Sequence, residues 1–179
     1  MNKKQIYILS LLLSLMVVLI LMQRFFLEDI RKVAMRNNGV KEFFEYKLKE
    51  GEYKVLLPME WSVEESREDI DEKEIEIEFN SDKVEGNITI LNNTYSIKEM
   101  DASMFLDITN KKHYGYKSNG VYWDVIDYEV LENNNTFKNK CYFREYSEGK
   151  VILISFEYAK SKAKPSIEVV FEEIVDNFR

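Results

Sequence analysis

The sequence predicts an α+β fold, in which a mainly antiparallel sheet has helices packed on it and an N-terminal transmembrane helix precedes it. Three observations lead to this prediction. An apolar run of helical length stands near the N-terminus, strand-like segments follow one another with short turns between them, and two segments change to a helical spacing of apolar residues. Strands joined by short turns pair antiparallel, and amphipathic helices cover a sheet. The expected order after the first helix is three strands, a helix, three strands and a helix (β3-α-β3-α).

The N-terminal run has the length and composition of a membrane anchor. Ile6 to Met22 is a 17-residue apolar run interrupted only by two serines and carrying no charge. At 1.5 Å per residue it spans about 26 Å, slightly less than a hydrocarbon core of about 30 Å. Residues 25–27 are apolar and extend it, with Arg24 reaching to the interface.

A cleaved signal peptide is the alternative interpretation of this run. Lys3 and Lys4 precede it, as basic residues precede the apolar part of a signal sequence. Residues 21–27 are bulky, polar or charged and contain no A-x-A-like cleavage site, which favours an uncleaved anchor.

The sequence indicates the side of the membrane on which the C-terminal domain lies less directly than it indicates the anchor. Two lysines stand before the run and four basic residues follow it, so the positive-inside rule gives a near tie. A short basic tail before an apolar run has the form of a signal sequence, so we expect a single-pass protein of the cell membrane with its C-terminal domain outside the cytoplasm.

The chain divides into four parts. Residues 1–5 are a short basic tail, 6–27 the transmembrane anchor, 28–42 a helical stalk and 43–179 a soluble domain. Asn37, Asn38 and Gly39 end the stalk helix, because Asn and Gly tolerate the left-handed cap.

The first half of the domain predicts three strands and a helix. Tyr53 to Leu57 is a short strand stopped by a proline, Glu74 to Phe79 alternates apolar and acidic residues, and Asn87 to Leu91 follows with Gly86 in the connection. Ser96 to Lys112 changes to a helical period, and its Ser-x-x-Glu start is a capping box.

The second half repeats this order. Val121 to Leu131 and Lys140 to Tyr146 are strands around an asparagine-rich turn, and Lys150 to Tyr158 is strongly β-prone. Lys160 to Lys164 forms a basic loop. Pro165 then opens a last helix with a wide apolar stripe, since proline fits a first helical turn.

Composition excludes several functions. The net charge of −7 speaks against nucleic-acid binding and against broad adhesion to anionic lipid. Cys141 and His113 are the only residues of their types, which rules out an intramolecular disulfide, a cysteine zinc cluster and a histidine-based zinc site. We expect Cys141 to be a small buried side chain and His113 an exposed loop or helix-end residue. No phosphate loop, GxSxG or HExxH motif is present.

Two groups of acidic residues are candidates for a calcium site or for catalytic carboxylates. Residues 64–78 hold nine acids in fifteen positions without EF-hand spacing, which favours a solvated surface over a calcium site. Asp127 and Glu129 share one face of a strand, but strand neighbours two apart point the same way and not across a cleft. We therefore expect no catalytic residue, no metal, no cofactor and no enzyme activity.

One aromatic stretch is a candidate recognition surface for a peptide or glycan. Tyr114, Tyr116, Tyr122 and Trp123 lie near two glycines. Packing of these rings in the core and turn is the alternative interpretation.

Three segments resemble the PsbP-like domains, an α/β/α sandwich group with many small bacterial envelope members. They are Tyr53-Lys-Val-Leu-Leu-Pro58-Met-Glu-Trp61, the paired strands over 142–158, and the closing helix with Glu173-Ile-Val-Asp-Asn-Phe178. The resemblance covers most of residues 43–179. The chain as a whole is similar to a bacterial membrane-anchored member of this group. The family includes photosystem subunits and a Ran-binding import factor, so the resemblance implies a non-enzymatic binding or accessory role without naming a partner.

Three functional hypotheses follow. The first is a membrane-anchored extracytoplasmic binding or accessory domain that engages a protein partner. The second is a carrier of a small molecule or lipid in the space between sheet and helices. The third is an envelope enzyme acting through Asp127 or Glu129.

Overall fold

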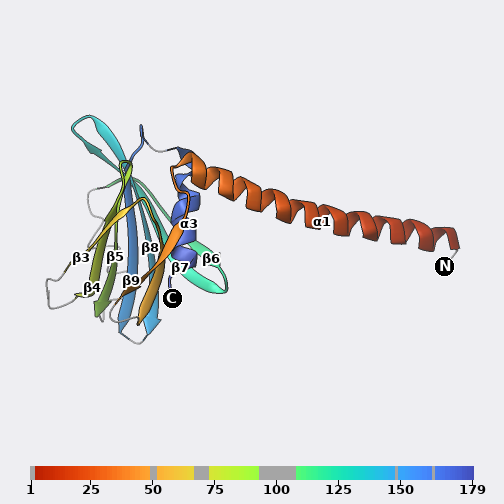
Figure 1. The fold of residues 1–179 in the computed structure, drawn as a ribbon, viewed down its shortest axis with the longest axis horizontal. Coiled ribbons are helices and arrows are strands. Elements are labelled where there is room, and N and C mark those ends of the chain that lie inside the picture. The colour runs from red at the N-terminus through yellow and green to blue at the C-terminus, as the bar shows by residue number, and fades with distance from the viewer. Residues whose placement is uncertain (1–2, 49–51, 67–72, 93–107, 148, 163) are drawn as a thin grey trace.

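A computed structural model describes residues 3–48, 52–66, 73–92, 108–147, 149–162 and 164–179, and Figure 1 shows its long N-terminal helix leaving a strand-rich body. The elements in these ranges are α1 (Lys3–Asn37), β1 (Phe43–Leu48), β2 (Tyr53–Pro58), β3 (Ser62–Ser66), β4 (Lys73–Asn80), β5 (Val84–Asn92), β6 (Thr109–Ser118), β7 (Val121–Glu132), β8 (Asn135–Ser147), β9 (Lys150–Ala159), the 3₁₀ turn η2 (Pro165–Ile167) and α3 (Glu168–Asp176).

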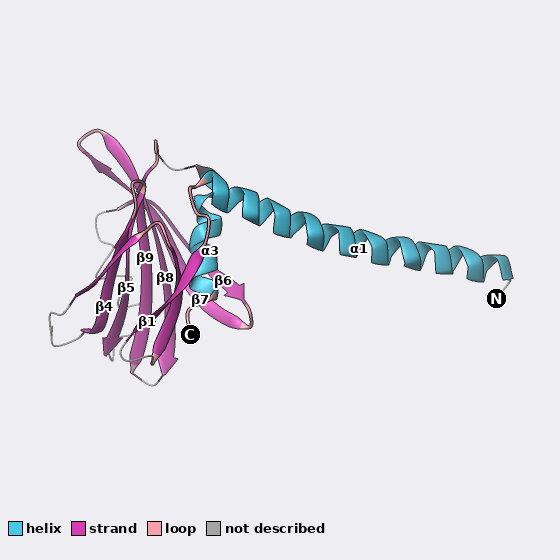
Figure 2. Cartoon of the chain, in the orientation of Figure 1, coloured by secondary structure: helices cyan, strands magenta, loops and turns pink. Residues whose placement is uncertain are grey.

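The strands form one large and one small sheet (Figure 2). The large sheet has seven strands in the order β3-β4-β5-β9-β8-β7-β6, and β1 pairs with β2 in a separate ribbon. Every neighbouring pair is antiparallel. The predicted α+β class with a mainly antiparallel sheet is confirmed.

The predicted strands are confirmed, with longer ends than expected, as β2, β4, β5, β7, β8 and β9. Gly86 is a correction, because it lies inside β5 and not in the connection before it. A Cβ at Gly86 would come within 2.5 Å of the Phe79 ring and of the Ser155 carbonyl oxygen, so the strand needs glycine at this position.

The predicted order of three strands, helix, three strands and helix is not what the described residues show. Most of the helix expected over Ser96 to Lys112 falls in residues 93–107, outside the described part of the chain. Its end is wrong, because Thr109 to Lys112 begin β6. β6 is exposed along almost its whole length, so it lacks the apolar alternation that identifies a strand. β1 and β3 were likewise not predicted.

The main core lies on the face of the large sheet that α3 and the β1–β2 ribbon cover. The Phe171 ring of α3 stacks on the Phe156 ring of β9 with centroids 4.1 Å apart and planes 11° apart. On the ribbon side, the Tyr53 ring stacks on Phe178. A smaller apolar cluster lies on the opposite face around Ile126, Cys141 and Phe143.

The end of α1 is built as the sequence predicts. Gly39 has a φ of 84° and its N–H donates to the Arg36 carbonyl, while the N–H of Val40 donates to the Met35 carbonyl. These two bonds form a Schellman motif, which satisfies the last carbonyls of the helix. Val40 and Met35 then pack against the main core.

The last turns of α1 also contact the C-terminal helices. The buried Asn38 donates from Nδ2 to the Ala34 carbonyl at 2.8 Å and to the Ser166 hydroxyl at 3.0 Å. Arg31 lies 3.8 Å from Glu172 and 3.7 Å from Glu173 on α3. α1 is therefore one continuous helix whose C-terminal end belongs to the folded body.

The other end of α1 is apolar and wholly exposed. Lys4–Gln23 forms a 20-residue stretch that is long and apolar enough to cross a membrane. A helix of this kind near the N-terminus serves either as a membrane anchor or as a signal sequence.

Candidate functional site

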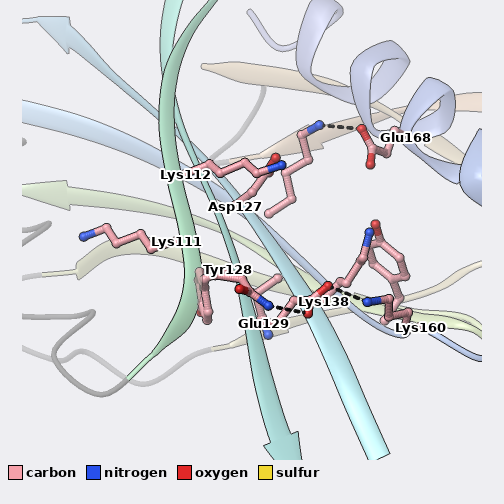
Figure 3. A pocket seen from close by; sticks show the side chains of 12 residues that line it. Lys111, Lys112, Asp127, Tyr128, Glu129, Lys138, Lys160 and Glu168 are labelled. Carbon is pink, nitrogen blue, oxygen red and sulfur yellow. Dashed lines mark hydrogen bonds and ion pairs between the residues drawn. The ribbon is translucent and has the colours of Figure 1, made fainter.

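A polar hollow of about 490 Å³ opens beside the start of α3, where β6, β7 and β8 run past it (Figure 3). Its lining includes five lysines and three acidic residues, an excess of two positive charges in a chain of net charge −7. We call it the basic hollow, and its lining residues are Asn110, Lys111, Lys112, Asp127, Tyr128, Glu129, Lys138, Asn139, Lys140, Tyr158, Lys160 and Glu168.

A β-bulge shapes one wall of the basic hollow. Between Thr109 and Lys112 the register of β6 against β7 shifts by one residue. Asn110 in the bulge has a φ of 54°, a left-handed conformation that Asn tolerates. Its Nδ2 donates to Glu129 Oε2 at 3.0 Å. Bulges re-aim side chains next to functional sites, and this one turns an amide toward a carboxylate.

Glu129 is held by two partners at once. Lys160 Nζ donates to Glu129 Oε1 at 3.0 Å, while Asn110 occupies the other oxygen. Hydrogen bonds from Lys160 and from Asn110 hold the pKa of Glu129 below its ordinary value, because both favour the charged carboxylate. Glu129 is therefore a structural anion here.

Lys140 forms the floor of the basic hollow. Its side chain is 7% exposed and Nζ donates to Glu168 Oε2 at 2.8 Å. The same ammonium lies 5.8 Å from the ring centroids of Tyr114 and Tyr142. Burial alone disfavours the charged amine, but the neighbouring Tyr142, the hydrogen bond to Glu168 and the nearby Tyr114 and Asp127 together more than offset this, so the pKa of Lys140 is raised. The positive charge of this lysine is permanent at neutral pH.

Asp127 lies next to Lys140 on the same face of the sheet. The Tyr114 hydroxyl donates to Asp127 Oδ2 at 2.9 Å. Burial raises the pKa of Asp127, and the nearby Lys140 ammonium only partly offsets this. Oδ1 of the same carboxylate is buried and has no hydrogen-bond partner. This oxygen is the unpaired acceptor of the site.

This arrangement suits binding of an anionic group better than catalysis. The three carboxylates of the basic hollow each already accept a hydrogen bond, whereas Lys112 and Lys138 take part in no ion pair within the described part of the chain. Asp127 and Glu129 project from one strand in the same direction, as expected from their spacing. Within the described ranges, no group of three His, Cys, Asp or Glu side chains could hold a metal ion.

The four aromatic residues of the candidate recognition surface do not form one exposed surface, because Tyr122 lies on the other face of the sheet from the three remaining residues and Trp123 is buried. Trp123 is 1% exposed in the main core, where the Arg144 guanidinium lies 4.8 Å from its ring centroid. The Tyr116 hydroxyl donates to Asp176 on α3 at 2.9 Å. Tyr122 is 57% exposed and its ring covers Gly115 on the opposite face from Tyr114. Only Tyr114 and Tyr122 are left exposed, so a recognition role for this stretch stays a prediction about those two residues.

The remaining candidates are placed as follows. Cys141 is buried, as expected, and burial raises the pKa of its thiol to about 12. His113 is exposed, as expected, but it lies on β6 and not at a helix end, with Nε2 3.3 Å from Asp124 Oδ1. Of the acidic run, residues 67–72 are outside the described part, and Glu64, Glu65 and Glu78 are exposed. A solvated face fits these three residues.

Sequence reasoning missed the basic hollow. Lys138 and Lys140 alternate on β8 and so share one face, which was the one available signal. Asn139 is also on β8, and the other lining residues come from β6, β7, β9, the turn after β9 and α3, which only the folded sheet brings together.

No protein-family model and no curated protein matches this chain. Solved structures do resemble it. Cyanobacterial PsbP (CyanoP) from Synechocystis has a TM-score of 0.51 at 12% identity, over 78% of this chain and 93% of that one. A variant of the protein Mog1 has a TM-score of 0.53 at 12% identity, over 78% and 96%. A Bacteroides thetaiotaomicron protein has a TM-score of 0.51 at 14% identity, over 75% and 47%. Identities this low show the fold alone, which is the PsbP/Mog1-like fold.

Proposed function

We propose that this chain is a single-pass, membrane-anchored binding or accessory domain that engages a protein partner outside the cytoplasm. The observation that carries this proposal is the continuity of α1. The same helix contains the exposed apolar stretch Lys4–Gln23 and ends inside the domain core. A signal sequence that is removed has no reason to form one helix with the body it leaves, so the geometry favours an anchor over a cleaved segment.

The contacts between the end of α1 and the body fix the orientation of the body relative to the anchor. The Schellman motif, the Asn38 bonds and the Arg31 ion pairs all oppose rotation of the body about α1. A domain on a flexible linker samples many orientations, whereas this one is presented to a partner in one orientation. Presentation of this kind suits an accessory subunit that holds another protein near the membrane.

The basic hollow is the site at which we expect the partner to bind. An acidic side chain or a C-terminal carboxylate of the partner would reach Lys138, whose ammonium group has no carboxylate within ion-pair distance in the described structure. The charged floor of the hollow argues against the lipid-carrier alternative, because acyl chains bind in apolar cavities. The enzyme alternative stays a hypothesis without a nucleophile or an acid–base pair to support it.

Photo-crosslinking in cells tests this proposal. A photoreactive residue at Lys138 or Lys160 is expected to give one reproducible adduct, whose crosslinked peptide is acidic or C-terminal by mass spectrometry. The same residue at Lys47, an exposed lysine of β1, is the matched control and is expected to give none. An adduct from position 160 that persists after Lys138→Glu would contradict binding through the basic hollow.

A further inference from the structure

The two edges of the large sheet carry opposite charge. β6, at one edge, contains three lysines, one histidine and no acidic residue. β3 and β4, at the other edge, together contain five glutamates and one lysine. One edge of the large sheet is therefore basic, although the chain as a whole carries a net negative charge.

α1 leaves the body toward this basic edge. In Figure 1 the β6–β7 hairpin lies on the side of the body toward which α1 extends, and β3 lies on the opposite side. A membrane crossed by Lys4–Gln23 would consequently face β6, with β3 and β4 turned away from it.

The length of α1 brings this edge close to lipid headgroups. Among the described side chains of α1, Arg31 is the first with an ion pair to α3, and it follows Gln23 by eight residues, or about 12 Å of helix. The headgroup layer on one side of a bilayer is roughly 6 Å thick. The distance that remains between the headgroup layer and the level of Arg31 along α1 is roughly the length of a lysine side chain. Lysine reaches toward an interface by extending its charged end.

The acidic residues behind β6 do not cancel its charge. Of the β7 carboxylates, Asp124 faces His113 and Glu129 is bonded to Lys160. Asp127 lies opposite Lys112 in the register and accepts a hydrogen bond from the Tyr114 hydroxyl. Lys112 and Lys117 are exposed and form no ion pair with any described residue. The exposed Tyr122 adds an amphipathic ring of the kind that gathers at membrane interfaces.

We propose that Lys111, Lys112, Lys117 and Tyr122, here called the β6 edge surface, bind the anionic phospholipid headgroups of the membrane that α1 crosses. Phosphate charge complements the lysines, and the body then rests on its β6 edge with the acidic β3–β4 edge outward. This proposal rests on the membrane anchoring proposed above. Pairing of the basic edge of one copy with the acidic edge of another is disfavoured, because copies anchored in one membrane all turn β6 toward it.

Site-specific fluorescence on the full chain in vesicles tests the proposal. In a Cys141→Ala background, Ser118→Cys places a probe at the β6–β7 hairpin and Glu64→Cys places a matched probe on the opposite edge strand. Vesicles contain phosphatidylcholine alone, or phosphatidylcholine with phosphatidylglycerol, and a trace of lipid with a quencher on its headgroup. Phosphatidylglycerol is expected to increase quenching at position 118 and to leave position 64 unchanged.

Neutralising the lysines of the β6 edge surface is the second part of the vesicle experiment. Lys111→Gln, Lys112→Gln and Lys117→Gln together are expected to reduce the docked-to-undocked ratio by about fivefold per lysine. The control combines Lys47→Gln, Lys83→Gln and Lys162→Gln, which remove the same charge elsewhere, and is expected to leave the ratio unchanged. Equal quenching at position 118 in both lipids, or an equal loss in the control, would overturn the headgroup proposal.

Extraction of the same vesicles with alkaline carbonate separates the two proposals. A chain that stays with the membrane but shows no lipid-dependent quenching refutes the headgroup proposal and leaves the anchored binding domain standing. A chain that carbonate releases refutes the anchoring itself, and the headgroup proposal with it.

Discussion

Phe171 is the side chain that holds α3, and with it the wall of the basic hollow, on the sheet. It is fully buried, its ring stacks on Phe156 at 4.1 Å, and the Tyr158 ring lies 5.5 Å away. Phe171→Ala removes most of this contact from a position enclosed by a sheet on one side and a helix on the other. Glu168, which pairs with Lys140, stands less than one helical turn away.

The expected loss of stability follows from this packing. Truncation of a buried phenylalanine to alanine costs about 3–5 kcal/mol, including the cavity that it leaves. A well-stacked aromatic pair adds about 0.5–1.5 kcal/mol to the area buried, so the loss belongs in the upper half of that range, at about 4 kcal/mol. Phe171→Leu keeps much of the volume and is expected to cost about 1–2 kcal/mol.

Urea unfolding of the full chain in detergent, followed by the fluorescence of the two buried tryptophans, Trp61 and Trp123, measures both losses. Val169→Ala, at a half-buried neighbouring position on α3, is the matched control and is expected to cost less than about 1 kcal/mol. The leucine variant keeps the test informative if the alanine variant does not fold. A loss for Phe171→Leu and Phe171→Ala no larger than that for Val169→Ala would refute the packing described here.

Three further predictions concern a glycine pair, a carboxyl group and the thiol. Gly86→Ala is expected to cost more than about 2 kcal/mol by urea unfolding, because its Cβ meets the Ser155 backbone. The nearest atoms to a Cβ at Gly115 belong to the exposed Tyr122 side chain, so Gly115→Ala is expected to cost less than about 1 kcal/mol, and an equal cost of the two variants would contradict the register. Burial raises the pKa of Asp127 above 3.8, so the native state holds that proton more tightly than the unfolded chain and this group's contribution to stability falls as pH rises through the raised pKa. The free energy of unfolding of Asp127→Asn should therefore increase relative to that of the unmodified chain as the pH rises above 3.8. A difference between the two chains that does not change with pH would refute the raised pKa of Asp127. Cys141 is expected to react with a thiol reagent only in denaturant, since burial raises its pKa to about 12, and fast reaction of the folded chain would disprove its burial.

The elements that could be predicted from the sequence are those with a strong period. β9 is buried on both faces and rich in β-branched residues, and α3 carries a wide apolar stripe, so both were identified with nearly their true ends. The end of α1 followed from Asn-Asn-Gly, because a left-handed cap favours these residues.

The elements that were missed have no such period. β6 is an exposed edge strand with a bulge, and β3 is short and polar, so neither shows alternation. The basic hollow depends on contacts between distant positions, such as Lys140 with Glu168 and Glu129 with Lys160. Residue spacing along one strand predicts a shared face, but it does not predict which strands become neighbours.

The side of the membrane on which the domain lies is the most direct test of the proposed function. A reporter active only outside the cytoplasm and a second reporter active only inside it would each be fused after Arg179, which is exposed. The account predicts activity of the outside reporter alone, with the full-length chain retained in the membrane fraction. Activity of the inside reporter, or release of a shortened chain from the membrane, would contradict an anchored extracytoplasmic binding domain.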